Sequence, residues 1–241
     1  MNDGGQTNKK MYRVFGIILA GGQGARLGNN LPKQFVNLYN RPIITWSLEK
    51  FNIHPKINGI IVITPLEYTL LIEEIVKEHK ISNITKIIPG GETRQGSSYN
   101  ALHSIDFNSD DILVFHDAAR PFIKKELIDK CIEETEAYGA CGVYIKAIDT
   151  IAEADRDLIK HIPDRAKLYY TQTPQSFKYS IIREAHEVAL LRDITDSSDD
   201  VQLAIEAGYN VKIIEGDYSN IKITTPLDLE FARFIAEKKC N

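Results

Sequence analysis

The chain has 241 residues, of which 43% are hydrophobic and 26% charged, an ordinary composition for a globular protein. Its formal net charge is −4 and its pI about 5.9, so no overall basic field attracts nucleic acid or anionic lipid. The three cysteines are an odd number without metal-type spacing, which argues against a disulfide framework and a zinc site. We therefore expect reduced thiols in a cytoplasmic protein.

The chain begins with a polar stretch, residues 1–12, that we expect to be a flexible leader before one domain over 13–241. The apolar run that follows it, Val14 to Ala20, is too short for the core of a signal peptide or for a membrane span. This again favours the cytoplasm, with no membrane partner.

Short apolar runs rich in β-branched residues alternate along the chain with segments of helical period. The predicted strands are Val14–Leu19, Gly59–Thr64, Ile84–Ile88, Ile112–His116, Cys141–Ile148 and Val211–Glu215. The predicted helices are Pro42–Phe51, Tyr68–His79, Lys125–Tyr138, Tyr179–Leu190, Val201–Ala207 and Pro226–Lys238. This alternation predicts a Rossmann-like α/β fold, in which a mostly parallel sheet carries helices on both faces.

The stretch 149–175 breaks the alternation. Charged turns there separate three short pieces of β-type sequence, Thr150–Ala152, Leu158–Ile162 and Leu168–Thr171. This pattern indicates a hairpin or arm that projects from the sheet.

A glycine-rich loop, residues 20–28, follows the first strand, where ligands of parallel sheets bind. Its backbone N–H groups can approach phosphate oxygens closely, and Arg26 and Lys33 add two positive charges. The loop is not a P-loop, because no Gly-Lys-Ser/Thr follows, and Leu27 interrupts a dinucleotide fingerprint. Glycines alone predict only a tight turn, but together with two cations they favour a triphosphate site.

A second polar cluster, residues 89–98, follows the third predicted strand. Its backbone donors and hydroxyls suit a base or a ribose. The structural alternative is the start of a helix capped by serine.

The third cluster runs from His116 to Phe122, after the fourth strand. Asp117 is placed to hold Mg²⁺ through its oxygens, and Arg120 to bind a phosphate; the structural alternative is an ion pair that frames a turn. We interpret His116 as a structural neighbour, because no second histidine stands at metal-binding spacing. The fourth cluster, Asn220 to Thr225, follows the last predicted strand. Its Lys222 either points toward the crevice beyond the carboxyl ends of the strands or is an ordinary solvated lysine.

At these clusters the sequence resembles the family of 2-C-methyl-D-erythritol 4-phosphate cytidylyltransferases and their relatives, the ribitol 5-phosphate cytidylyltransferases. The resemblance extends from about Val14 to the last helix. Its most specific pieces are the glycine loop with Pro32-Lys33-Gln34, His116-Asp117-Ala118-Ala119-Arg120-Pro121, Gln172-Thr173-Pro174-Gln175 and Asn220-Ile221-Lys222-Ile223-Thr224.

The resemblance implies a transfer of CMP from CTP to methylerythritol phosphate with release of pyrophosphate, in isoprenoid precursor synthesis by the non-mevalonate pathway. It implies transition-state stabilisation by Arg26 and Lys33, and it assigns Asp117 both to the substrate and to a Mg²⁺ ion. The residues implied to contact CTP are Ala20, Gly21, Gly22, Gly24, Gly91, Glu92 and Ser97.

The resemblance further implies that Arg165 and Lys222 hold the phosphate of the acceptor, with help from Arg120, Thr150 and Thr173. In this family the arm crosses to a second subunit. A homodimer is therefore expected, in which Thr150 and Arg165 of one protomer complete the pocket of its partner.

Such a reaction needs no covalent intermediate, so catalysis consists of positioning and charge stabilisation. The attacking phosphate is already ionised at neutral pH, which agrees with the lack of a convincing His/Asp dyad in the sequence.

Three alternatives remain. Leu19-Ala20-Gly21-Gly22 and Tyr218-Ser219 lean toward the ribitol phosphate relatives, whereas Asp117-Ala118-Ala119-Arg120 is typical of the methylerythritol phosphate enzymes, which we favour. A non-catalytic nucleotide-binding protein would be expected to have lost some of the charged site residues. All five are present: Arg26, Lys33, Asp117, Arg165 and Lys222. A nicotinamide-dependent dehydrogenase is disfavoured by the broken glycine fingerprint.

Overall fold

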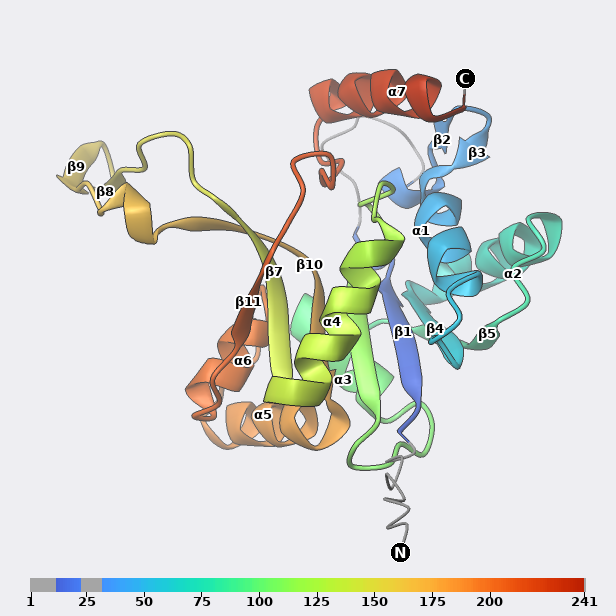
Figure 1. The fold of residues 1–241 in the computed structure, drawn as a ribbon, viewed down its shortest axis with the longest axis horizontal. Helices are drawn as coiled ribbons and strands as arrows, with labels where there is room; N and C mark the ends of the chain where they lie inside the picture. The colour runs from blue at the N-terminus through green and yellow to red at the C-terminus, as the bar shows by residue number, and fades with distance from the viewer. Residues whose placement is uncertain (1–11, 23–31, 241) are drawn as a thin grey trace, which may run out of the picture.

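The central element of the fold is a seven-stranded sheet with the order β11-β7-β10-β6-β1-β4-β5 (Figure 1). A computed structural model describes residues 12–22 and 32–240 of the chain. All neighbouring strands pair in parallel except β10, which is antiparallel to both β6 and β7. The strands are β1 (Val14–Leu19), β4 (Gly59–Thr64), β5 (Ile84–Pro89), β6 (Ile112–Asp117), β7 (Ala140–Lys146), β10 (Tyr169–Lys178) and β11 (Lys212–Glu215).

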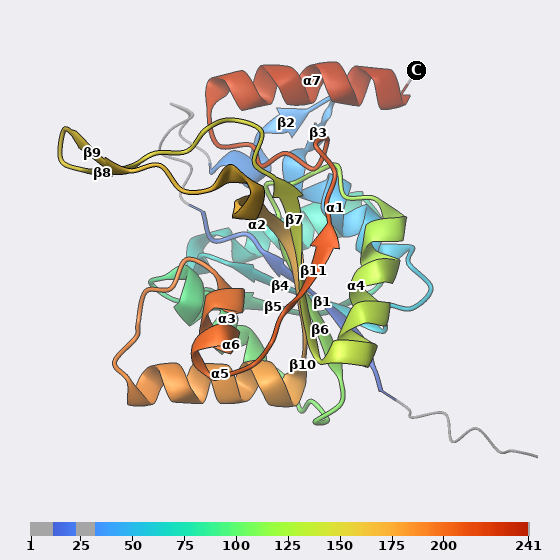
Figure 2. The ribbon, with the colours of Figure 1, turned by 60° about the vertical axis from the view of Figure 1, so that its left-hand side comes forward.

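Helices cover both faces of this sheet, as the sequence predicts (Figure 2). The helices α1, α2 and α4 pack on one face, and α3, α5 and α6 pack on the other. Neighbouring residues of β1 point to opposite faces: Ile18 belongs to the first core and Ile17 to the second. The helices are α1 (Ile43–Asn52), α2 (Thr69–Glu78), α3 (Arg94–Leu102), α4 (Lys125–Tyr138), α5 (Tyr179–Leu191), α6 (Asp200–Glu206) and α7 (Pro226–Cys240).

The last helix, α7, crosses the top of the molecule in Figure 1. Leu229 and Ala232 of α7 join Trp46 and Phe122 in a separate apolar cluster. The short strands β2 (Asn37–Leu38) and β3 (Arg41–Pro42) lie beside it (Figure 1). Helix α7 therefore covers the same edge of the sheet at which the glycine loop leaves β1.

The predicted strands and helices are confirmed, and their ends differ from the prediction by two residues at most, at β7 and α7. Besides the short strands β2 and β3, two elements of the described chain were not predicted. The first is α3, whose polar sequence carries little helical periodicity; the start of a helix was only an alternative there. The second is β10, because its buried segment Gln172–Ser176 is polar and lacks the apolar run of a buried strand.

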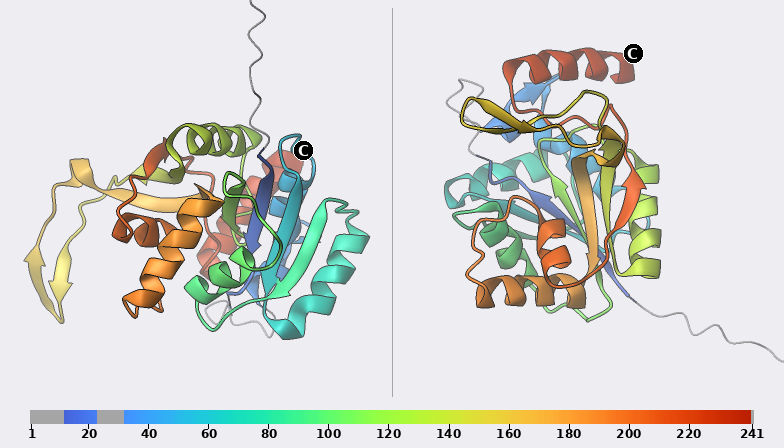
Figure 3. Two further views of the ribbon diagram at one scale, coloured as in Figure 1. Left: turned by 90° about the horizontal axis from the view of Figure 1, so that it is seen from below. Right: turned by 90° about the vertical axis from the view of Figure 1, so that its left-hand side faces the viewer.

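The region expected to be an arm divides into two parts. A hairpin of β8 (Glu153–Asp155) and β9 (Leu158–His161) projects away from the sheet (Figure 3). From Tyr169 onward, however, the chain has returned to the central sheet as β10. The projecting part therefore ends before residue 169, short of the expected limit at 175.

The remaining expectations about the chain concern its beginning, its thiols and membranes. Of the expected leader, residues 1–11 lie outside the described residues, while the Tyr12 hydroxyl donates a hydrogen bond to Glu136 Oε2 at 2.9 Å. Cys131 and Cys141 are buried free thiols. None of the helices over the described residues has the length and apolar character of a membrane span.

Candidate active site

A cavity of about 240 Å³ lies where β1, β5 and β6 end, and we call it the glycine-loop cavity. It brings together every described residue that the sequence assigned to CTP, although these residues lie in two separate loops. They are Ala20, Gly21, Gly22, Gly91, Glu92 and Ser97. Gly24 and Arg26, the other residues assigned to this loop, lie outside the described residues.

The second loop of this cavity is locked to the start of α3. Ser97 Oγ accepts a hydrogen bond from Gly91 N at 3.1 Å and donates one to Thr93 O at 3.0 Å. Thr93 in turn caps α3 by accepting from Gly96 N at 3.0 Å. A Cβ at Gly91 would lie 2.6 Å from the backbone of Gly96, so only glycine fits there. The loop is thus both a capped helix start and a wall of the cavity.

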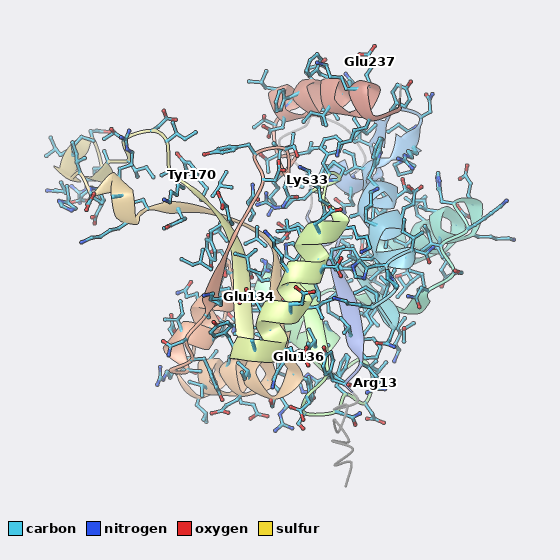
Figure 4. The ribbon with its side chains drawn as sticks, in the orientation of Figure 1. Arg13, Lys33, Glu134, Glu136, Tyr170 and Glu237 are labelled. Atoms are coloured by element: carbon cyan, nitrogen blue, oxygen red, sulfur yellow. The ribbon has the colours of Figure 1, made fainter. Side chains whose placement is uncertain are left out.

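The opposite wall is formed by the short 3₁₀ turn η2 (Lys33–Phe35). The buried Gln34 donates from Nε2 to Ala20 O at 2.5 Å, which ties η2 to the end of β1. Lys33 lines the cavity, and a Cβ at Gly22 would lie 3.4 Å from Lys33 Cε. The sequence expectation that Lys33 faces the glycine loop is met; Figure 4 shows Lys33 at the end of the sheet below α7.

A second cavity of about 220 Å³ adjoins the first, and we call it the β10 cavity. Thr171, Gln172, Thr173 and Gln175 of β10 contribute to its wall, as does Arg120. Three of the described residues line both cavities: Arg94, Asp117 and Lys222. A ligand in one cavity would therefore meet a ligand in the other at these three charged side chains.

Asp117, the last residue of β6, is the anionic centre of this junction. Its Oδ2 lies 2.8 Å from Lys222 Nζ and 3.7 Å from Arg120 Nε. Burial by itself would raise the pKa of Asp117, but the charges of Lys222, Arg94 and Arg120 outweigh it and hold the pKa well below its usual range. Asp117 is thus a carboxylate at any physiological pH.

His116, directly before Asp117, is fully buried in the sheet. Its Nε2 lies 3.0 Å from Arg120 O, which can only accept, so Nε2 carries the proton. Its Nδ1, 3.0 Å from Thr173 Oγ1, then accepts from that hydroxyl, which itself accepts from Asp117 N at 3.1 Å. Burial lowers the pKa of His116 to about 4, in agreement with a neutral ring. His116 is therefore the structural neighbour that the sequence indicated.

Arg120 is held largely by backbone oxygens. Its Nη1 donates to Asn220 O at 2.8 Å and its Nη2 to Thr171 O at 3.2 Å. It still lines the β10 cavity, but two of its five N–H groups connect the loop after β6 to β10 and to the segment before α7.

The donor set at the junction fits one Mg²⁺ ion only if a ligand supplies most of the oxygens. Within residues 12–22 and 32–240 no three acidic, histidine or cysteine side chains gather as a metal site. Mg²⁺ commonly binds through one or two carboxylates together with substrate phosphates and water. Asp117 meets that requirement as the single carboxylate.

The arm residues do not join this site within one chain. Arg165 donates from Nη1 to Ile148 O at 2.7 Å in the arm, and both Arg165 and Thr150 are exposed. Neither lines the glycine-loop cavity or the β10 cavity.

Sequence reasoning assigned no role to Arg94 and Asp199, which also line these cavities. Asp199 Oδ2 accepts from Gln175 Nε2 at 2.7 Å and thereby joins β10 to the start of α6. Arg94 stood inside the second polar cluster, and its place directly after the Thr93 cap was the one available signal. The partners of both residues are far apart in the chain, so no local pattern reveals them.

The sequence matches the family described as "IspD: 2-C-methyl-D-erythritol 4-phosphate cytidylyltransferase" over residues 14–238. The protein of that name from Clostridium tetani is 40% identical over 233 residues, which cover 96% of this chain and 94% of the relative. A Clostridium botulinum (strain Okra) protein of the same name is 39% identical and covers 92% of this chain and 96% of its own.

Solved structures agree with these sequence matches. The crystal structure of 4-diphosphocytidyl-2C-methyl-D-erythritol synthase from Anaerococcus prevotii superimposes with a TM-score of 0.81 at 27% identity, covering 94% of this chain and 96% of that one. The Francisella tularensis 2-C-methyl-D-erythritol 4-phosphate cytidylyltransferase gives a TM-score of 0.77 at 29% identity, over 92% and 99% of the two chains.

Proposed function

The chain belongs to the 2-C-methyl-D-erythritol 4-phosphate cytidylyltransferase family, and we propose that it transfers CMP from CTP to 2-C-methyl-D-erythritol 4-phosphate and releases pyrophosphate. The observation that supports this reaction most directly is the pair of adjoining cavities that share Asp117 and Lys222. CTP would occupy the glycine-loop cavity and the acceptor the β10 cavity. The product belongs to isoprenoid precursor synthesis.

In this reaction an oxygen of the acceptor phosphate attacks the α-phosphorus of CTP in line. The bond to the β-phosphate breaks, and pyrophosphate leaves with the electron pair. Lys33 faces the nucleotide side, where its charge, with that of Arg26, stabilises the developing negative charge. Lys222, at the junction, holds the attacking phosphate. No proton has to be removed from the nucleophile, so the neutral His116 needs no role as a base.

We place a Mg²⁺ ion at Asp117 when CTP is bound. The low pKa of Asp117 keeps the carboxylate available as a ligand, and the phosphates of CTP would supply further oxygens. The ion would neutralise charge on the triphosphate. Asp117 would thus hold the ion from the protein side, while Lys222, 2.8 Å from its Oδ2, would bind the acceptor phosphate.

The active assembly in this proposal is a cytoplasmic homodimer formed through the arm. Leu158, Ile159 and Ile162 expose more than half of their surface there, at 66%, 63% and 58%. A solvent-facing apolar group of this kind suits a partner surface. Arg165 and Thr150 would reach the β10 cavity of the neighbouring protomer, since they line neither cavity of their own. Buried free thiols suit a reducing compartment.

Subunit mixing tests the shared site. Arg165→Ala and Lys33→Ala each inactivate the enzyme if both roles are correct. When the two variants are mixed and re-associated, some dimers carry one intact site, so partial activity should return. Mixed dimers that form and stay inactive would exclude a site completed in trans.

The reaction itself is tested by pyrophosphate release with CTP and Mg²⁺. Methylerythritol 4-phosphate and ribitol 5-phosphate are compared at equal, sub-saturating concentration. Turnover of the first supports the proposal. Turnover of ribitol 5-phosphate alone would replace the acceptor and leave the mechanism unchanged, whereas CTP binding without turnover of either would indicate a nucleotide-binding protein.

A further inference from the structure

Among the described residues, Arg94 is the one that lines both cavities and has no role in the proposed reaction. It is the first residue of α3, directly after the Thr93 cap. Its side chain is only 22% exposed, and it is the second-strongest charge, after Lys222, that lowers the pKa of Asp117. Arg94 therefore adds a positive charge beside Lys222 at the point at which the two substrates would meet.

The Arg94 guanidinium is anchored by a carboxylate with no exposed surface. Arg94 Nη1 donates to Asp200 Oδ2 at 2.8 Å, and Ser98 Oγ donates to the same oxygen at 3.0 Å. His186 Nε2 lies 3.3 Å from the other oxygen, Oδ1. Three helices, α3, α5 and α6, thus meet at Asp200 and fix the direction of the guanidinium before any ligand binds.

Arg94 differs from a purely structural arginine in how many of its donors the protein uses. Within the described residues, the structure gives the Arg94 guanidinium one hydrogen bond, to Asp200, out of five N–H groups. Arg13, by contrast, donates from Nε and Nη2 to Asp111 and also from Nη2 to Asp106 O, and it lines neither cavity. Arg94 keeps donors for a ligand, and a planar fork of N–H groups matches phosphate oxygens.

Arg120, the arginine to which the sequence assigned a phosphate, is less well suited. Its two terminal nitrogens donate to the carbonyl oxygens of Asn220 and Thr171. Arg94 has no such backbone partner among the described residues.

We propose that Arg94 is a catalytic residue that binds the phosphate undergoing transfer, and this rests on the proposed function. Its fork contacts non-bridging oxygens of the α-phosphate while the acceptor oxygen bonds to phosphorus and the bond to pyrophosphate breaks. Arg94 remains protonated throughout and exchanges no proton. The anchor at Asp200 holds the fork in place, so little ordering is required when charge develops.

The test compares Arg94→Gln and Arg94→Lys with Arg13→Gln, a matched change in another arginine paired with a buried aspartate. Pyrophosphate release is measured at saturating CTP and acceptor, with thermal unfolding for each variant. We expect Arg94→Gln to lower kcat by about 100-fold or more. Arg94→Lys should lose less, because it keeps the charge without the fork. Arg13→Gln should lower the unfolding temperature and keep the wild-type kcat.

A second measurement, calorimetric binding of CMP, whose phosphate is the α-phosphate of CTP, separates this proposal from the proposed function. Arg94→Gln should weaken this binding by about tenfold, and Arg13→Gln should leave it unchanged. If the wild type releases no pyrophosphate but Arg94→Gln still weakens CMP binding, the proposed reaction fails and the contact with the phosphate stands. If the wild type turns over and a folded Arg94→Gln matches it in kcat and binding, the role of Arg94 is overturned. Should Arg94→Gln not fold, wild-type kcat and CMP affinity in Arg94→Lys would overturn it.

Discussion

The two ends of strand β6 carry two buried aspartates with opposite surroundings. Asp111 precedes the strand and accepts four hydrogen bonds, from Arg13 N, Nε and Nη2 and from Asn108 N. Asp117 ends the strand, and its carboxylate has only the ammonium group of Lys222 within 3 Å in the described part of the chain. Figure 4 shows the same separation, with Arg13 and Lys33 at opposite ends of the sheet.

This difference teaches how one strand serves stability and chemistry at once. At the amino end the chain itself satisfies every oxygen, so Asp111 closes the sheet against the loop before it. At the carboxyl end the carboxylate stands in the wall of two cavities, with coordination left for a ligand. Stability should therefore respond to changes at Asp111, and activity to changes around Asp117.

Asp111→Ala should have the largest effect. It removes four hydrogen bonds and leaves the backbone N–H groups of Arg13 and Asn108 without their partner. We expect a loss of about 3–5 kcal/mol in the free energy of unfolding, with kcat unchanged at temperatures where the variant is folded. Denaturant unfolding measures this, and Asp110→Ala, at a half-exposed neighbour, is the control. An inactive variant of wild-type stability would reverse the comparison.

Lys222→Ala should come next, and its effect should appear in catalysis. The change removes the cation nearest to Asp117 at the junction of the cavities. We expect kcat/KM for the acceptor to fall by an amount equivalent to about 2.7–4 kcal/mol. Because Lys222 is 40% exposed, stability should change little. Unaltered kinetics would remove the junction from the mechanism.

His116→Gln tests the carboxyl end of β6 through the pH dependence of the protein's stability. The pKa of His116 is lowered to about 4 in the folded protein, so the unfolded chain binds the proton first as the pH falls from about 6.5. The wild type should therefore lose stability between about pH 6.5 and 4, with a slope of at most about 1.4 kcal/mol per pH unit from this residue. The variant lacks that slope.

Urea unfolding of both proteins at several pH values measures the difference between the slopes. Asp117 loses stabilisation below about pH 5, where the unfolded chain begins to bind its proton, but it does so in both proteins and therefore cancels from the difference between the slopes. Equal slopes in the two proteins would show that His116 is not held neutral.

Lys124→Ala should have the smallest effect, although it also lies near the carboxyl ends of the strands. Lys124 pairs with Asp217, and the hydrogen bond from Lys124 lowers the pKa of Asp217 to about 2. Because the Lys124 side chain is 51% exposed, water screens the pair, and the loss of stability should stay below about 1 kcal/mol. Thermal unfolding tests this prediction. A larger loss of stability would show that solvent exposure does not weaken the Lys124–Asp217 pair.

Much of the fold was predictable because its signals are local. The runs Val14–Leu19 and Gly59–Thr64 are continuously apolar, and both are strands with the predicted limits. Strand β10 was not predictable in this way, because Gln172 and Gln175 are buried polar residues whose partners, Asp217 O and Asp199, come later in the chain. Their satisfaction is a tertiary property.

In the candidate site, too, some residues have a local sequence signal and others are recognised only through their tertiary contacts. Lys33, Asp117 and Lys222 stand directly after strands or within recognisable motifs, so the sequence alone placed them at one edge of the sheet. Arg94 could not be assigned, because its anchor Asp200 lies 106 positions away. The sequence distinguished Asp117 from Asp111 only by its place at the carboxyl end of the strand, and it did not reveal the hydrogen bonds that saturate Asp111.

By itself, the sequence determined the alternation of strands and helices, the family, and the edge of the sheet where charge collects. The reason is that apolar periodicity acts over a few residues, and parallel strands necessarily bring their carboxyl ends together. Only the tertiary structure decided which carboxylate is saturated, which arginine keeps donors for a ligand, and which side chains stand between the two cavities. Those outcomes depend on hydrogen bonds between groups that are distant in the chain, and burial makes each such bond decisive.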